Sequence, residues 1–145
     1  MKTIAIYSAI VATALLGATT AMATEEAGAR FTATLDGASE APGPGDPDGM
    51  GTATITVNPG REQLCYSITV TGIAPARAAH IHEAPAGTAG PVVIALNAPT
   101  GGTSQGCVTV SREFAKGFIK DPSDYYVNVH NADYPRGAVR GQVGK

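Results

Sequence analysis

The segment QLCYSITVTG (63–72) places an apolar side chain at every second position. Side chains two residues apart lie on the same face of a β-strand, so this segment is expected to bury one face and expose the other. The apolar positions are Leu64, Tyr66, Ile68 and Val70. This alternation, closed by a glycine, predicts a strand at the border of an apolar core.

The same kind of segment recurs along the chain, and Gly/Pro-rich turns separate many of the copies. The further segments are FTATL (31–35), GTATITVN (51–58), AAHIHE (78–83), PVVIALN (91–97), GCVTV (106–110), YYVNVH (125–130) and GAVRGQV (137–143). About eight short strands rich in Thr and Val predict an all-β fold, an antiparallel β-sandwich.

Two segments depart from the alternation. SREFAKGFIK (111–120) has apolar residues at helical spacing, and Ser111 suits a helix N-cap, so we expect one short helix over an opening of the sandwich. ASEAPGPGDPDGMG (38–51) is too rich in Gly and Pro for either element. It is expected to be a flexible surface loop, because Asp46 and Asp48 lack the later ligands of a calcium loop.

The N-terminus has the pattern of a secretory signal. A lysine precedes an apolar segment (4–16) without acidic residues, and the small-x-small pattern AMA (21–23) follows. The apolar segment is short for a membrane span, although an anchor that stays attached is the alternative. We expect residues 1–23 to be the signal peptide and 24–145 to be one secreted or periplasmic domain without a stable membrane anchor.

The composition of the chain limits the classes of molecule that it is expected to bind. The chain has 145 residues, enough for one core, and a formal net charge of −2. Its basic residues do not cluster, so no nucleic acid is expected to bind. The expected partner is an extracytoplasmic molecule that the sequence does not identify.

The two cysteines, Cys65 and Cys107, are expected to form a disulfide, because an even count in an exported protein favours one. The alternative is a thiol metal site or redox pair, but the close CxxC spacing is absent. Both cysteines lie opposite the aliphatic residues of their segments. The bridge is therefore expected outside the core, joining adjacent strands or a loop.

The three histidines of the chain all lie in two of the predicted strands. Strand parity puts His80 and His82 on one face, and His130 shares a face with Asn128; both faces lie opposite the aliphatic residues. Two interpretations remain: solvated strand residues, or three imidazoles that converge on copper or zinc at a solvent-reachable patch. In the second, Asn128 and Glu83 are expected to orient a ligand ring.

No catalytic residue is predicted. The serines lack a GxSxG turn, the acidic residues form no recognisable pair, and no glycine-rich phosphate loop follows a strand. Arg136 and Arg140 are expected to be a turn-flanking charge and a solvated strand residue, with anion or partner contacts as the alternative.

The segments AAHIHEAPAGTAGPVVIALN (78–97) and DYYVNVHNADYPRGAVRGQV (124–143) resemble the CHRD domain, named after chordin. The resemblance extends from Phe31 to about Val143. It implies an extracellular β-rich module, often found in bacterial proteins with little beyond a signal peptide, and carries no agreed catalytic activity. Growth-factor antagonism is not implied, because the cysteine-rich modules of chordin are missing.

The segment HIHE (80–83) is also similar to the HVH strand of copper-zinc superoxide dismutase, a β-sandwich with an internal disulfide. This resemblance implies a metal at the histidines. That enzyme holds copper with four histidines and zinc with further ones, whereas this chain has three in all, so dismutation is not carried over.

The expected function is therefore a non-enzymatic binding or structural module outside the cytoplasm. The alternative is a copper- or zinc-binding protein that uses His80, His82 and His130, with redox activity on small oxygen species as its enzymatic form.

Overall fold

The alternating segments form one eight-stranded antiparallel sheet in the computed structural model, which describes residues 28–145. The strands are β1 (Ala29–Asp36), β2 (Met50–Asn58), β3 (Gln63–Thr71), β4 (Ala78–Glu83), β5 (Val92–Leu96), β6 (Thr103–Thr109), β7 (Tyr125–His130) and β8 (Val139–Gln142). Their order in the sheet is β5-β4-β7-β8-β1-β2-β3-β6. The predicted all-β class and the eight strands are confirmed.

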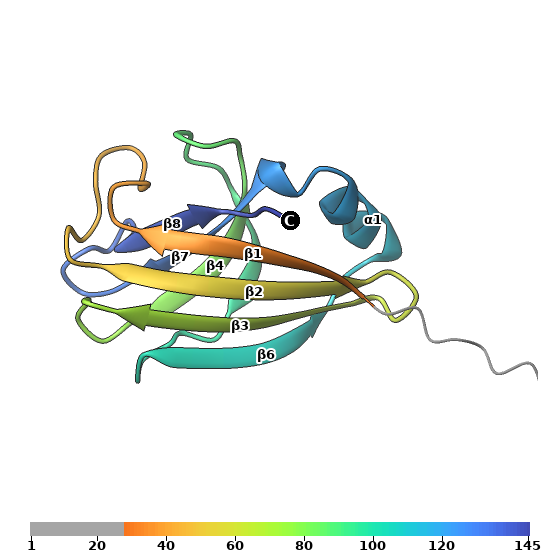
Figure 1. Cartoon of the computed structure of the whole chain (residues 1–145), viewed down its shortest axis with the longest axis horizontal. Coiled ribbons are helices and arrows are strands. Elements are labelled where there is room, and N and C mark those ends of the chain that lie inside the picture. Colours follow the sequence, from red (N-terminus) through yellow and green to blue (C-terminus); the bar gives the residue numbers. More distant parts are fainter. Residues whose placement is uncertain (1–27) are drawn as a thin grey trace, which may run out of the picture.

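The sheet curls on itself and is nearly closed into a barrel-like sandwich. Figure 1 shows β1, β2, β3 and β6 as one layer, with β4, β7 and β8 behind it. The two ends of the strand order, β5 and β6, do not pair with each other. Aliphatic side chains from both layers, among them Leu64, Ile81 and Val127, are fully buried between them.

The predicted helix is α1 (Arg112–Lys120), followed by a 3-10 turn, η1 (Pro122–Asp124). The side chain of Ser111 accepts a hydrogen bond from the backbone N–H of Phe114 at 3.0 Å, as expected of an N-cap. Phe118 is buried against Phe31, with ring centroids 5.6 Å apart. The helix therefore packs its apolar face onto one end of the sandwich (Figure 1).

The disulfide joins Cys65 to Cys107, which are directly opposite each other in the ladder between β3 and β6. Their α-carbons are 4.0 Å apart. Because both cysteines alternate with core residues, the bridge lies on the outer face of the sheet. The predicted staple between adjacent strands is confirmed.

The Gly/Pro-rich segment 38–51 leads into β2 through turns, and its backbone is tied to the rest of the fold. Gly45 N–H donates to Gly37 O at 2.7 Å, and Asp46 N–H donates to Ala138 O at 2.8 Å. Glu40, near its start, is only 9% exposed. Residues 38–49 are therefore neither helix nor strand, as predicted, whereas Met50 and Gly51 already belong to β2. The Glu40 carboxylate is buried.

The predicted signal peptide, residues 1–23, lies outside the described residues. Within residues 28–145, no helix has the length and apolar character needed to cross a membrane.

Candidate metal centre

Two neighbouring strands carry the three histidines. β4 pairs with β7 in a register that sets His80 opposite Asn128, His82 opposite Tyr126, and Ala78 opposite His130. The side chains that alternate with buried Ile81 and Val127 therefore gather on the other face of the sheet. The convergence of the histidines depends on this pairing, which the sequence alone did not establish.

The three imidazoles lie close enough to share one ion. One ring nitrogen from each histidine can be chosen so that all three lie within 4.8 Å of one another. His80 Nδ1 is 3.1 Å from His130 Nε2. Nitrogens bound to one zinc or copper ion lie roughly 3–4 Å apart, so a small side-chain movement brings the set to ligand distances.

His82 is the most buried of the three, with 8% of its surface exposed. Its Nδ1 lies 2.9 Å from the carbonyl oxygen of Gly90. Its Nε2 is buried and has no hydrogen-bond partner within residues 28–145. A buried polar atom without a partner is costly, which makes this nitrogen the clearest sign of a missing ligand.

The hydrogen bond to Gly90 determines where the proton of His82 lies. A carbonyl oxygen can only accept, so His82 Nδ1 must donate to Gly90 O. His130 faces such oxygens at both ring nitrogens, Pro135 O at 3.1 Å from Nδ1 and Asn128 Oδ1 at 3.0 Å from Nε2, and a neutral ring can donate to only one of them. In a neutral imidazole the other nitrogen then carries a lone pair. His82 thus presents an unprotonated Nε2 to the cluster, as metal-ligating histidines do, and His130 does so when its proton is on Nδ1.

Burial also favours the neutral rings. Desolvation, and then the neighbouring His82 ring, lowers the pKa of His80 below its ordinary value of 6.5. Desolvation and the His80 ring lower the pKa of His130, although its bond to Pro135 opposes this. Near pH 7 the rings of His80 and His130 are therefore neutral, the state in which an imidazole can bind a metal ion.

The two residues predicted to orient the rings lie in different places. Asn128 is buried, and its side-chain oxygen is 3.0 Å from His130 Nε2. Glu83 is exposed at the end of β4, opposite Tyr125. Among the described residues, its carboxylate makes no hydrogen bond to a histidine ring.

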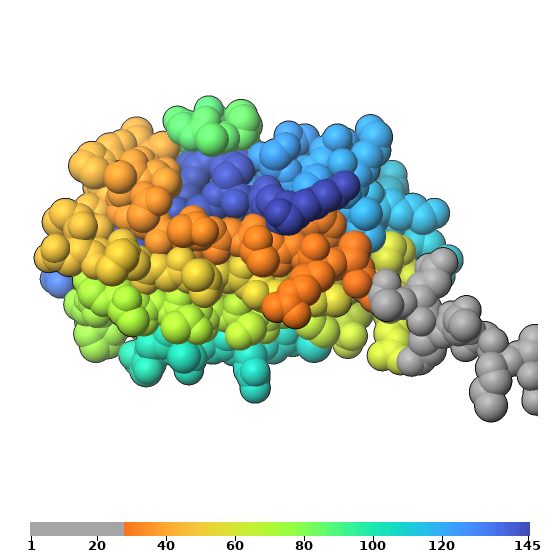
Figure 2. Space-filling view, in the orientation of Figure 1, coloured from red at the N-terminus to blue at the C-terminus, as the bar shows by residue number. Residues whose placement is uncertain are grey.

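Sequence reasoning missed the backbone carbonyls of Gly90 and Pro135, which orient His82 and His130. Each lies in the Gly/Pro-rich loop that follows a histidine strand, and this position was the only signal available. Figure 2 shows the 84–91 loop, in bright green, as a raised patch beside the blue C-terminal part of the domain.

Arg140 corrects the sequence analysis. It was predicted to be a solvated strand residue, but it is 1% exposed. Its guanidinium donates to the carbonyls of Thr88 and Pro85 at 2.8 and 3.0 Å, so the 84–91 loop folds over it. The 84–91 loop therefore covers the polar face of the sheet at Arg140, whereas His80 and His130 on the same face are only partly buried.

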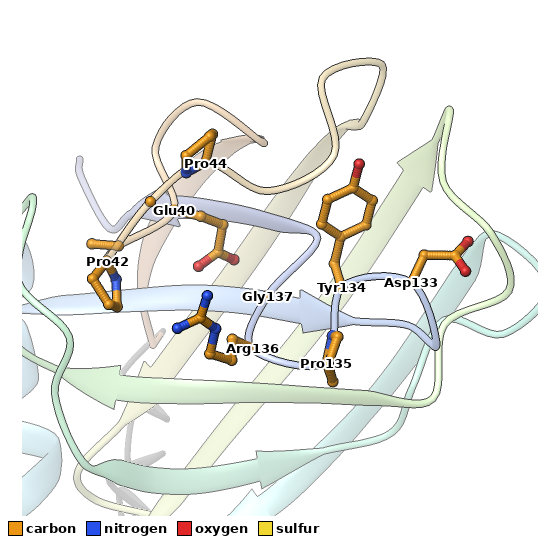
Figure 3. Close-up of a pocket in the computed structure, with 10 residues that line it drawn as sticks. Glu40, Pro42, Pro44, Asp133, Tyr134, Pro135, Arg136 and Gly137 are labelled. Atoms are coloured by element: carbon orange, nitrogen blue, oxygen red, sulfur yellow. The ribbon is translucent and has the colours of Figure 1, made fainter.

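A small pocket of about 110 Å³ lies between segment 38–51 and the β7–β8 connection. Figure 3 shows the Glu40 carboxylate pointing toward this connection, where Gly137 has a positive φ of 148° and no room for a Cβ. Burial raises the pKa of Glu40 to about 7, although Arg140 opposes the rise. The residues that line this pocket lie in loops, in segments 40–44 and 133–137.

Fold and site together define an extracytoplasmic-type, disulfide-bonded β-domain with a three-histidine cluster. The chain belongs to the CHRD domain family, whose match spans residues 31–143, nearly all of the described part. No curated protein and no solved structure matches the chain.

Proposed function

We propose that this domain is a non-enzymatic metal-binding module outside the cytoplasm, which holds copper or zinc with His80, His82 and His130. The buried, unpartnered Nε2 of His82 carries the proposal, because a metal ion would satisfy it. Neutral imidazoles suit both metals.

The proposed location rests on the disulfide and on the predicted signal peptide. A disulfide between Cys65 and Cys107 persists in an oxidising compartment and is rare in the cytosol. The predicted signal peptide, residues 1–23, agrees with export to the periplasm or the medium.

The metal site is tested by titrating the metal-free protein with Zn²⁺ and Cu²⁺ at pH 7.5 by calorimetry or chelator competition. We expect one ion per chain, and an affinity at least about 100-fold weaker in His82→Ala. Removing a residue that only orients a metal ligand weakens metal binding by about 10- to 100-fold, and removing the ligand itself should cost more. Gln105→Ala, an exposed change on β6, is the control and should bind like the wild type. Equal affinities in the wild type and His82→Ala would refute the site.

The non-enzymatic part is tested separately. The copper-loaded protein should consume superoxide no faster than the same concentration of free copper. Turnover well above free copper, abolished by His80→Ala, would instead establish the redox enzyme that the sequence analysis kept as its alternative.

A further inference from the structure

A permanent cation is stacked beside the candidate metal centre. The guanidinium carbon of Arg140 lies 3.4 Å from the ring centroid of Tyr126. The His82 imidazole stacks on the same ring, with centroids 4.8 Å apart and an interplanar angle of 5°. Because β7 lies between β4 and β8, His82 and Arg140 approach Tyr126 from opposite sides. One aromatic ring therefore separates the charge from a ligand ring.

The charge of Arg140 is not neutralised by direct contact. Its hydrogen bonds go to neutral oxygens: the carbonyls of Thr88 and Pro85, and the side chain of Gln142 at 3.4 Å. In the described part of the chain, no carboxylate lies within ion-pair distance of it. Glu40 is the acidic group whose ionisation Arg140 favours, and it is itself buried. Because the guanidinium is buried, the part of its positive field that Glu40 does not oppose acts on its surroundings with little screening by water.

The donors of the site are also uncharged. The cluster contains three imidazoles, with the Asn128 amide beside them, and no carboxylate or thiolate. Neutral ligands do not offset the charge of a bound ion, so a divalent ion in this partly buried site would be repelled by the Arg140 guanidinium. A monovalent ion would feel half of this repulsion.

The geometry adds a second argument. Cu²⁺ prefers tetragonal coordination with coplanar donors. The histidine rings come from two adjacent strands, and the Gly90 and Pro135 carbonyls hold two of them at fixed orientations. Such a set caps one side of an ion. A filled d¹⁰ shell, as in Cu⁺ and Zn²⁺, accepts this arrangement without electronic cost. The geometry therefore disfavours Cu²⁺, while the charge of Arg140 disfavours both divalent ions.

We infer that Arg140 makes the three-histidine site selective for monovalent copper over divalent ions. The inference rests on the proposed metal site and names the ion that it prefers. Tyr126 holds the arrangement together, since its hydroxyl also accepts a hydrogen bond from Gly90 N–H at 3.1 Å.

The test is the ratio of the Cu²⁺ and Cu⁺ dissociation constants, measured at pH 8 by chelator competition, without oxygen for Cu⁺. In Arg140→Gln the ratio should fall about tenfold, and Zn²⁺ should bind more tightly, because a unit charge within about 10 Å is removed. Arg140→Lys keeps the charge but loses the planar stack, so its ratio should stay near that of the wild type even if all affinities drop. Arg30→Gln, an exposed charge on β1, is the control.

The Glu40→Gln variant gives an independent test of the inference if the Arg140 variants do not fold. At pH 8 it removes the carboxylate that opposes Arg140 and leaves the stack intact, so the ratio should rise. A ratio unchanged in both Arg140→Gln and Glu40→Gln overturns the inference, as does an equal fall in Arg140→Lys. In those cases the loss of metal binding in His82→Ala would still support the site itself. Failure of the wild type to bind any of the three ions would refute the proposed function instead.

Discussion

At the scale of single residues, three buried side-chain atoms within residues 28–145 have no hydrogen-bond partner: the hydroxyl oxygen of Ser104 and two atoms of titratable groups, His82 Nε2 and Glu40 Oε1. The imidazole nitrogen carries a lone pair and faces two other rings, so a cation satisfies it. The Glu40 oxygen belongs to a desolvated carboxyl group whose pKa is raised to about 7. The same lack of a partner therefore indicates a ligand site at His82 and a proton at Glu40.

The pKa of Glu40 predicts how stability depends on pH. Because the folded-state pKa is about 7, above the ordinary 4.5, the folded protein binds this proton more tightly than the unfolded chain does. Its contribution to stability is full below pH 4.5 and is lost as the pH rises to about 7. Glu40→Gln should therefore raise the free energy of unfolding at pH 8 by about 2 kcal/mol and change it little at pH 4.

Urea unfolding of both proteins at pH 4 and pH 8 measures this difference. Asp48→Asn, an exposed change in the same loop, is the matched control and should show no such dependence on pH. A Glu40→Gln variant that is less stable than the wild type at pH 8 would mean that the ionised carboxylate, paired with Arg140, stabilises the fold.

At the scale of elements, β6 depends on one neighbour. It lies at the end of the strand order, and within the described sheet it pairs only with β3. The disulfide crosses this pair at Cys65 and Cys107, so it reinforces the ladder at the edge of the sheet. β5 is the other edge, and it lacks such a bridge among the described residues.

Removing the bridge should loosen β6 first. The bridged residues are 42 positions apart, and the chain-entropy model gives about 4 kcal/mol for a loop of that length, as an upper value. The double variant Cys65→Ala, Cys107→Ala should lose about 2–4 kcal/mol of stability, with the fastest gain in amide hydrogen exchange in β6. Reductant should destabilise the wild type and leave the double variant unchanged. Uniform exchange across all strands would show that β6 does not open separately.

At the scale of the whole molecule, the candidate metal site joins parts that are distant in the chain. His80 and His82 come from β4 and His130 from β7, while the loops after both strands orient the rings. An ion that binds there connects the folded parts and has no such site in the unfolded chain. Metal binding should therefore stabilise the whole fold.

Thermal unfolding measures this coupling. Free Zn²⁺ at 100 times its dissociation constant should add about 2.7 kcal/mol at pH 7.5, and a chelator should remove the gain. The gain should be smaller at pH 5.5, because protons then compete with the metal ion for the imidazole nitrogens. The pKa values of His80 and His130 lie below 6.5, so this competition appears only at acid pH. His130→Ala should show no gain at either pH. An equal gain in His130→Ala would place the ion elsewhere.

The sequence by itself determined the strands, the helix, the disulfide and the faces that the histidines occupy. Each depends on local information: alternation assigns QLCYSITVTG (63–72) to a strand, and parity puts His80 and His82 together opposite Ile81. The family segments agreed with this, and the match over residues 31–143 confirmed the resemblance.

Only the tertiary structure decided what lies beside each strand and what covers it. Strand order is a non-local property, and the pairing of β4 with β7 brings His130 to His80. The alternation in β8 predicts that the Arg140 side chain points away from the core. This pattern is the same whether water or a loop covers the side chain. The 84–91 loop lies there, and its carbonyls bury the guanidinium and orient His82. Backbone carbonyls exist at every residue, so no side-chain pattern could have identified them in advance.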